Sequence, residues 1–446
     1  MFHHPYLYTF LFFISIVGFA KAQTQDQFIN KIYPDLESLY KHLHQNPELS
    51  LQEKETSARL AKELRDLGFE VTENIGGYGI VGMLRNGEGP VLMIRTDMDA
   101  LPLEEKTGLE YASKKRGVTA DGKETYIMQA CGHDVHMSVF IGTAKMLTQF
   151  KDQWQGTLMM IGQPAEENGL GAYNMINDGL FERFPVPDYA IALHDTPNLP
   201  AGSIGYKAGP LMAGVDMMNV TVYGEGGHGA APHMTIDPIV MSAQMIQAYQ
   251  TIVSRRIAPT EPAVVTVGSI HGGSVHNIIP DEVTMQLTLR YYAPEIREIL
   301  ISNIKKISEH VARSAGMSEE KMPSYWIREP YTPPLINDTE LTKLMVAVFK
   351  REFEEEKIIE IEAEMIGEDF SRYGIQDPPV PYSMFFLGAT DPELFRKAKE
   401  TDTEIPGLHS PFFAPKREPT IKTGVKAMTN YAIEILKLKG QQSTVD

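Results

Sequence analysis

The sequence predicts an α/β fold in which a large domain, built on a central and mostly parallel sheet, is interrupted by a smaller ferredoxin-like α+β insert. Short apolar runs without alternation predict the sheet, because parallel strands buried on both faces have this pattern. The runs alternate with helical patterns, as in α/β domains whose sheet is covered on both faces. They are Val91–Ile94, Leu158–Ile161, Tyr189–Leu193 and Met384–Leu387.

Two helices are predicted before the first of these runs. Apolar residues between positions 36 and 43 recur at helical spacing, which predicts the first helix. A second helix is predicted from about Lys54 to Leu67, and Gly68 is the kind of residue that ends a helix. His42 and His44 are expected to be surface residues of the first helix, without a functional role.

The middle of the chain predicts the insert. Its patterns follow the order strand, helix, strand, strand, helix, strand, which is the split βαβ or ferredoxin-like unit. Asp237 and Pro238 suit the start of its first helix, since Asp is a good N-cap and Pro fits the first turn. The large domain accordingly has two parts, residues 23–212 and 326–446, on either side of an insert at residues 213–325.

The first 22 residues predict a signal peptide. The segment from Tyr6 to Ala20 is almost wholly apolar but short for a membrane span, and Ala20-Lys21-Ala22 gives an A-x-A cleavage pattern. An uncleaved anchor is the alternative, and the cleaved form is favoured. We therefore expect an exported protein, periplasmic or secreted, with no membrane attachment after processing.

Charge and cysteine content narrow the possible partners. The 41 basic and 58 acidic residues give a formal net charge of −17, and a negative field repels nucleic acid and anionic membrane surfaces. We expect neither as a partner.

Cys131 is the one cysteine, so the exported chain has no internal disulfide and the thiol needs another explanation.

Acidic and imidazole side chains follow three of the predicted strands. Ligands of open parallel sheets bind beyond the carboxyl ends of the strands. Asp97 and Asp99 follow the first run, Glu166 and Glu167 follow the second through a Pro turn, and His194 follows the third. These side chains are therefore expected to meet at one edge of the sheet.

Cys131 and His133 are expected to join that edge, because residues two apart on an extended segment point the same way. A mixed set of sulfur, nitrogen and oxygen ligands suits zinc, manganese, cobalt or nickel better than magnesium or calcium. Neighbouring side chains diverge, so Glu167 can hold a metal while Glu166 takes a proton from the attacking water. Each residue alone has an ordinary structural explanation, but their convergence favours a metal site.

Eight short motifs run through essentially the whole mature chain. They are residues 44–50 (HQNPELS), 97–102 (DMDALP), 131–134 (CGHD), 163–167 (QPAEE), 227–233 (GHGAAPH), 277–281 (NIIPD), 367–371 (GEDFS) and 408–413 (LHSPFF). In this order they resemble peptidase family M20. More narrowly, they resemble its amidohydrolase branch, which contains hippurate hydrolases, N-acyl-amino-acid amidohydrolases and plant auxin-conjugate hydrolases.

The resemblance implies two divalent metal ions per chain and a role for each site residue. The metal ligands would be Cys131, bridging the two ions, together with His133, Glu167, His194 and His409. Glu166 would be the general base. Asp99 matches the aspartate that orients a metal-bound histidine in other branches of the family.

The resemblance also implies that the insert is a lid or dimerisation domain, with a homodimer formed through residues 213–325. His228 would help to stabilise the oxyanion, in some relatives across a dimer interface. Asn277 and Arg290 would hold polar groups or the carboxylate of the substrate. Because His228 and Arg290 lie on the insert, a domain closure that brings them to the metals is expected.

The expected function is that of a metal-dependent amidohydrolase. It would cleave the amide bond of N-acetyl-, N-benzoyl- or N-arylacetyl-amino acids by two-metal activation of water. One alternative is a dipeptidase or carboxypeptidase that uses the same machinery on small peptides. A more remote alternative is a non-catalytic periplasmic metal- or peptide-binding protein, and the presence of Glu166 beside the ligands argues against it.

Overall fold

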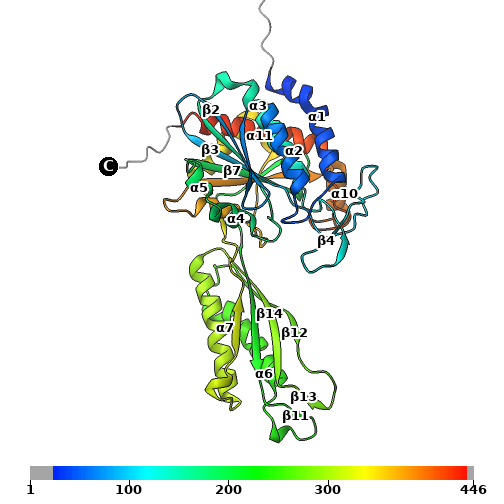
Figure 1. The fold of residues 1–446 in the computed structure, drawn as a ribbon, viewed down its shortest axis with the longest axis vertical. Helices are drawn as coiled ribbons and strands as arrows, with labels where there is room; N and C mark the ends of the chain where they lie inside the picture. Colours follow the sequence, from blue (N-terminus) through cyan, green and yellow to red (C-terminus); the bar gives the residue numbers. More distant parts are fainter. Residues whose placement is uncertain (1–23, 439–446) are drawn as a thin grey trace, which may run out of the picture.

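The structure is a computed structural model that describes residues 24–438, so the predicted signal peptide lies outside the described residues. Figure 1 shows a large α/β domain, from which an elongated insert extends. Within residues 24–438 we find no helix with the length and apolarity needed to cross a membrane.

An eight-stranded sheet forms the centre of the large domain, and its central strands are parallel. The four predicted apolar runs lie side by side as β6, β3, β7 and β18, and each pairs in parallel with the next. The strands, in their order across the sheet, are β1 (Glu70–Ile75), β2 (Gly79–Asn86), β6 (Gly156–Gln163), β3 (Val91–Asp97), β7 (Tyr189–Pro200), β18 (Tyr382–Thr390), β8 (Ile204–Tyr206) and β17 (Ile358–Glu360). The predicted α/β fold class is confirmed.

Helices cover both faces of this sheet. Successive side chains of a buried strand point alternately to one face and the other, so the apolar runs make both faces apolar and both must be covered. One face packs on α1 (Gln25–Gln45), α2 (Lys54–Asp66), α3 (His133–Gln149), α8 (Thr339–Glu352) and α11 (Arg417–Ile435). The other face packs on α4 (Gly171–Asn177), α5 (Leu180–Arg183) and α9 (Ser371–Gly374). The first two predicted helices are therefore α1 and α2, and α2 is followed by Gly68 in a left-handed conformation.

The insert is built on a four-stranded antiparallel sheet with the order β12-β14-β10-β15. Its elements are β10 (Gly214–Tyr223), α6 (Pro238–Arg256), β12 (Ala263–His271), β14 (Glu282–Tyr291), α7 (Pro294–Ser314) and β15 (Ser324–Ile327). They follow the predicted order, and Asp237 caps α6 by accepting from the amides of Ile239 and Val240. Helices α6 and α7 pack on one face of the sheet and form a separate core with it.

Shorter elements complete the described chain. A small pair of strands, β11 (Gly227–His228) and β13 (Ile278–Ile279), forms the end of the insert that lies farthest from the large domain (Figure 1). The remaining elements are β4 (Arg116–Val118), β5 (Glu124–Tyr126), β9 (Gly209–Met212), β16 (Leu335–Asn337), α10 (Pro392–Thr401) and the 3-10 turns Lys151–Gln153, Pro232–Met234, Glu319–Lys321 and Glu355–Lys357.

The prediction of β7 was too short. This strand continues six residues beyond His194, to Pro200, and pairs with β18 at Asp195, Thr196 and Pro200. Its pairing with β3 stops at Ile191. His194 therefore lies inside a strand, at a point where the pairing with β3 has already stopped and the pairing with β18 continues.

Candidate active site

Three other predicted metal ligands converge near the thiol of Cys131. The Sγ atom lies 3.6 Å from Nε2 of His194 and 3.3 Å from Nε2 of His409. The same nitrogen of His409 lies 3.4 Å from Oε2 of Glu167. These residues come from the loop before α3, from β7, from the loop after β6 and from the segment before α11, so the fold brings distant parts of the sequence together.

Gly132 is what allows Cys131 and His133 to reach the same site. The expectation of an extended segment was wrong, because Gly132 has a left-handed backbone (φ 75°) and His133 is the first residue of α3. A Cβ atom at this position would also collide with the carboxylate of Asp195. The turn at Gly132 therefore directs both side chains to one place, and glycine is required there for two reasons.

The imidazoles of His133 and His194 are both oriented by backbone carbonyls. Nδ1 of His133 donates to the carbonyl oxygen of Asp99 at 2.9 Å, and Nδ1 of His194 donates to that of Asp195 at 2.7 Å. Each bond leaves the Nε2 atom of the ring to face the site. A hydrogen bond that fixes the tautomer in this way is typical of metal-binding histidines.

Asp99 positions both glutamates through their backbone. Its carboxylate accepts from the amides of Glu166 and Glu167, at 3.2 and 3.0 Å, and from the hydroxyl of Ser50 at 2.6 Å. Its Oδ1 atom lies 3.5 Å from Nδ1 of His133. Asp99 thus contacts the histidine mainly through its carbonyl, and it contacts the two glutamates through its carboxylate.

Glu166 and Glu167 lie in a buried environment that favours their protonated forms. Burial, reinforced by Glu368 and Glu167, raises the pKa of Glu166 well above its usual range. Burial raises the pKa of Glu167 to about 7. Without a cation beside them, both carboxyl groups therefore hold a proton to a higher pH than a surface glutamate does.

His409 reaches the site from a loop that no strand pattern predicts. It has a left-handed backbone (φ 62°), and its amide donates to the carbonyl oxygen of Ala130 at 2.8 Å. The loop is thereby attached next to Cys131. Only the motif at residues 408–413 indicated this residue.

A buried network of charged side chains supports the site, and Asp97 is the member that the strand pattern had already predicted at this edge of the sheet. Asp97 accepts from Nδ1 of His136 at 2.7 Å and from Arg95 at 2.8 Å. Arg95 also pairs with Glu368 at 2.9 Å and with Asp369 at 3.2 Å. The spacing of His133 and His136, three residues apart at a helix start, was the available signal, since both rings lie on one side of α3.

The expectation that His44 is a surface residue was wrong. Its side chain is buried, and its ring contacts Asp134 Oδ2 at 2.6 Å and Glu105 Oε1 at 3.1 Å. Burial alone would lower the pKa of His44, but the hydrogen bonds to Asp134 and Glu105 raise it to about 9. His44 therefore joins α1 to the start of α3, close to the site.

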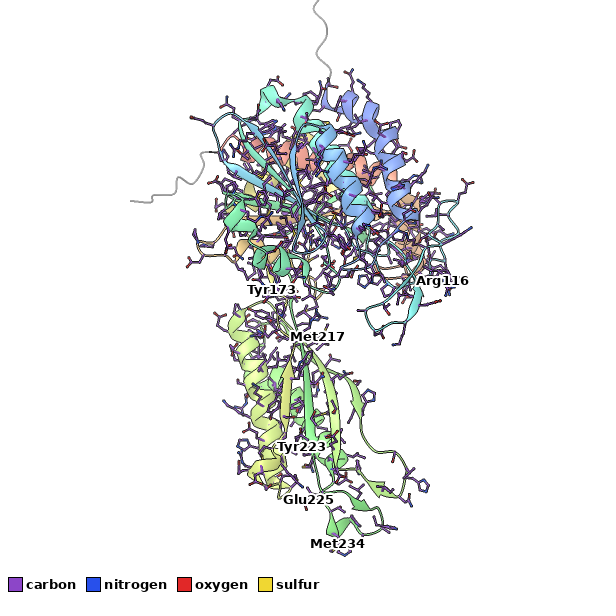
Figure 2. The ribbon with its side chains drawn as sticks, in the orientation of Figure 1. Arg116, Tyr173, Met217, Tyr223, Glu225 and Met234 are labelled. Atoms are coloured by element: carbon purple, nitrogen blue, oxygen red, sulfur yellow. The ribbon has the colours of Figure 1, made fainter. Side chains whose placement is uncertain are left out.

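A cavity of about 430 Å³ opens over the converging residues, between the large domain and the insert. Cys131, Glu166, His194 and Arg290 all line it. Figure 2 shows Met217, another lining residue, at the junction of the two domains. The predicted substrate residue Arg290 is thus already beside the candidate metal ligands.

His228 and Asn277 do not reach this cavity within one chain. His228 lies on β11 and Asn277 immediately precedes β13, at the far end of the insert, where Figure 2 labels Met234. Both are exposed, and neither lines the cavity. In this arrangement Arg290 lines the cavity and His228 does not, so the expected domain closure that brings both to the metals stays a prediction.

Comparisons with known proteins identify the family. A family model described as peptidase family M20/M25/M40 matches residues 93–433. The chain belongs to peptidase family M20. The resemblance to this family is therefore confirmed, and this M20 protein is a hydrolase.

Two curated relatives of the M20 chain have different named activities. It is 37% identical over 367 residues to N-acetyl-L-cysteine deacetylase of Bacillus subtilis (strain 168). This alignment covers 82% of this chain and 83% of the relative. It is also 37% identical over 350 residues to thermostable carboxypeptidase 2 of Saccharolobus solfataricus. That alignment covers 78% of this chain and 84% of the relative. The family relationship alone therefore leaves both deacylation and peptide cleavage open.

A solved structure supports a metal centre in this M20 fold. The YXEP protein of Bacillus subtilis, described as a dinuclear metal-binding peptidase from the M20 family, has a TM-score of 0.74 and 28% identity. The match covers 91% of this chain and 99% of that chain.

The residues present in the M20 chain fit metal ions. Nε2 of His133 and Oε1 of Glu167 are buried without a hydrogen-bond partner, which is costly unless a ligand satisfies them. Burial and the positive charge of His136 hold the pKa of His194 well below its usual range, so its ring is neutral and free to bind a cation. Two ligand groups, Cys131–His133–His194 and Cys131–Glu167–His409, have the thiol in common.

Proposed function

We propose that this M20 protein is an amidohydrolase that uses two divalent cations to cleave the amide bond of N-acyl amino acids. The observation that carries the proposal is the pair of ligand groups that share Cys131, next to Glu166, in a cavity that Arg290 also lines. The acyl group would be acetyl, benzoyl or arylacetyl. The same arrangement leaves cleavage of small peptides as the second candidate.

His133 and His194 would hold one cation and Glu167 and His409 the other, with the Cys131 thiolate common to both. Zinc, manganese, cobalt and nickel suit this mixture of sulfur, nitrogen and oxygen atoms. Cations bound there would supply Lewis acidity to a water molecule and to the amide carbonyl. Their charge would also stabilise the thiolate of Cys131, whose pKa burial otherwise raises well above its usual range.

Glu166 would move the proton in this reaction. Its carboxylate lines the cavity and lies 3.8 Å from Nε2 of His133, so it is next to the ligand atoms. Glu166 takes a proton from the attacking water and returns it to the leaving nitrogen, as the amide C–N bond breaks. The products are a carboxylic acid and an amino acid.

Arg290 would bind the carboxylate of the amino-acid half. It projects from β14 into the cavity and forms no ion pair with any side chain in residues 24–438. A free guanidinium suits a substrate carboxylate, which it can bind through two parallel hydrogen bonds. A peptide with a free C-terminus also carries this group, which is why the carboxypeptidase alternative stays open.

His228 and Asn277 would act in a homodimer formed through the insert. Both lie on the exposed outer end of the insert, where exposed Met234 and Ile278 offer apolar surface to a second copy. In that arrangement the insert of one copy would bring His228 to the cavity of the other, to stabilise the oxyanion. Mixing inactive Glu166→Gln and His228→Ala variants should restore activity if the site is shared, and should restore none if each chain acts alone.

The decisive experiment is turnover of a substrate panel after reconstitution with each of the four metals. N-acetyl-, N-benzoyl- and indoleacetyl-amino acids should be hydrolysed faster than dipeptides. The reverse order would select the dipeptidase or carboxypeptidase alternative. Binding of metal without turnover of any compound would favour a non-catalytic binding protein.

The same panel tests Glu166. We expect Glu166→Gln to lower kcat by about 10²- to 10⁴-fold, the range of general acid–base catalysis, while both metal ions stay bound. Glu320→Gln, the same change at an exposed position, serves as the control. Near-normal kcat in Glu166→Gln would overturn the mechanism.

Export is a separate part of the proposal, supported by the apolar N-terminal segment and its A-x-A sequence. N-terminal sequencing of the protein recovered from a bacterial host should find Gln23 as the first residue. An intact N-terminus would support the uncleaved anchor.

A further inference from the structure

A second arginine, Arg328, lines the cavity together with Arg290. Its amide donates to the carbonyl oxygen of Met217 on β10 at 2.9 Å, just beyond the end of β15. On the other side of β10, Arg290 of β14 lies opposite Val215. Val215 and Met217 are two residues apart, so they point to one face of the sheet.

Residues directly opposite each other on neighbouring strands share a face. Arg290 and Arg328 therefore flank β10 on the face that lines the cavity, whereas α6 and α7 cover the other face. Strands two positions apart in a sheet are separated by roughly 10 Å. Two long arginine side chains that converge from this distance can reach the two carboxylates of one small molecule.

One contact with the large domain and one within the insert hold the guanidinium of Arg328 near the candidate metal ligands. Its guanidinium donates to the carbonyl oxygen of Asn168, the residue that follows Glu167, and to Sδ of Met217 at 3.7 Å. These contacts occupy only part of its five N–H donors. The rest of the guanidinium is available to a ligand beside the site of amide cleavage.

The charges of both cavity arginines are unmatched by the protein. Within residues 24–438 no carboxylate forms an ion pair with Arg290 or Arg328, although Arg297 of the same insert is bound by Asp216 at 2.8 Å through two of its nitrogens. The chain has 58 acidic residues against 41 basic ones, so acidic partners are abundant. A half-buried cation without a partner loses hydration free energy that nothing replaces. A negatively charged ligand would neutralise both Arg290 and Arg328.

We propose that Arg328 binds a second carboxylate of the substrate, so that the enzyme prefers N-acyl derivatives of acidic amino acids. This inference rests on the proposed function, in which Arg290 takes the α-carboxylate. Since both arginines flank the same strand, Arg328 faces the side chain of the same amino acid. Glutamate and aspartate carry a carboxylate there, and a guanidinium recognises it by charge and by paired hydrogen bonds.

The test compares substrates that differ only in this carboxylate. For the metal-loaded wild type, kcat/KM for N-acetyl-L-glutamate should exceed that for N-acetyl-L-glutamine by about 10- to 100-fold, the worth of a charge-assisted hydrogen bond. The aspartate and asparagine derivatives form a second pair. Arg328→Gln should remove the preference and keep kcat/KM for N-acetyl-L-glutamine within about threefold, since that substrate lacks the charge.

Two further variants separate charge from structure. Arg328→Lys retains a cation and should keep part of the preference, because lysine lacks the fork of the guanidinium. Arg256→Gln removes an exposed arginine of the same insert and should leave both substrates unaffected. Turnover of the neutral substrate also reports that each variant is folded.

Several results would overturn the inference. Equal turnover of both members of each pair by the wild type would show that no second carboxylate is recognised. An equal loss on both members in Arg328→Gln would show that Arg328 shares the α-carboxylate with Arg290. If no N-acyl amino acid is turned over, charged or neutral, the proposed function fails as well.

Discussion

At the scale of single residues, Asp99 connects the parts of the site that must act together. Its carbonyl orients His133, and its carboxylate holds the backbone of both Glu166 and Glu167. Ser50 in turn donates to that carboxylate at 2.6 Å. A candidate ligand and the candidate base therefore depend on one side chain for their relative positions.

Replacing Asp99 with asparagine should disturb both glutamates. An amide has one acceptor oxygen and would place its NH2 group against a backbone N–H, so at least one of the two amide contacts is lost. We expect metal affinity and kcat to fall by about 10- to 100-fold each. Metal titration and steady-state kinetics measure the two effects. Asp338→Asn, the same change at the N-cap of α8, should alter neither.

His44 should make stability depend on pH. Its pKa is about 9 in the folded chain, against about 6.5 for an unperturbed histidine, so the folded state holds this proton more tightly than the unfolded state. The resulting stabilisation is complete below about pH 6.5 and is lost as the pH rises to about 9. At 1.36 kcal/mol per pKa unit, it is on the order of 3 kcal/mol.

Denaturant unfolding of the metal-free protein at several pH values measures this effect. In His44→Gln the fall in the free energy of unfolding between pH 6.5 and 9 should be smaller by about this amount, and the remainder belongs to groups such as His136, whose pKa is also raised to about 9. His310→Gln, a change at an exposed histidine of α7, should retain it. An unchanged slope in His44→Gln would mean that another group titrates in this range.

Residue patterns could predict which side chains meet but not how they are held. The ends of the predicted strands indicated that Glu167 lies at the site, and the C-x-H spacing indicated the same for Cys131 and His133. The extended geometry expected between Cys131 and His133 was wrong. His44 was misjudged because helical spacing alone does not show that Glu105, 61 residues away, covers it. The Arg95 and Asp97 network was missed for the same reason, since its partners Glu368 and Asp369 are distant in sequence.

At the scale of elements, α3 is the helix that carries the site. All residues from His133 to Leu147 except Lys145 are buried, because the helix lies between the sheet, α1 and α11. Its first turn presents His133 and Asp134 at the edge of the sheet, so the packing of the helix determines where the candidate ligand lies.

Close packing at Gly142 should make α3 intolerant of a single added methyl group. A Cβ atom there would collide with Val425 of α11 and lie 2.9 Å from Leu36 of α1. Although alanine favours helices, we expect Gly142→Ala to reduce the free energy of unfolding by about 1–3 kcal/mol. Gly268→Ala, at an open position of β12, should have little effect. Thermal and denaturant unfolding would distinguish the two variants.

Elements with a strong apolar pattern were predictable, whereas polar or very short strands at or near the edges of the sheet were not. The four central strands and all six elements of the insert follow their patterns closely. Strand β1 carries glutamates at both Glu70 and Glu73 and is mostly half-buried, so it lacks the apolar run of a central strand. Strands β8 and β17 have only three residues each, too few for any periodicity.

At the scale of the whole molecule, the candidate metal ligands and the candidate substrate-binding residues lie on different domains. The candidate metal ligands Cys131, His133, Glu167, His194 and His409 all belong to the large domain, whereas Arg290 and Arg328 lie on the insert. Val215 and Thr332 pair where the chain enters and leaves the insert. The insert is therefore joined to the large domain through two adjacent segments.

Excising the insert should separate metal binding from catalysis. Deletion of residues 216–331, with a short glycine turn joining the paired residues Val215 and Thr332, leaves the large sheet and its helices intact. We expect the shortened protein to fold and to bind the metals, but to lose amidase activity because Arg290 is gone. Circular dichroism, metal analysis and the substrate panel test the three parts. Retained activity would remove the insert from the mechanism.

The position of β18 in the sheet has a consequence for how the chain is made. It is the last strand to leave the ribosome, yet it lies between β7 and β8, in the interior of the sheet. The insert, by contrast, contains only segments synthesised earlier, and it can fold as a unit while the sheet of the large domain is still incomplete. A nascent or truncated chain that stops before Tyr382 therefore exposes the long edge of β7, which other chains can pair with. Premature termination late in the gene should consequently yield aggregated or degraded products rather than a partly active enzyme.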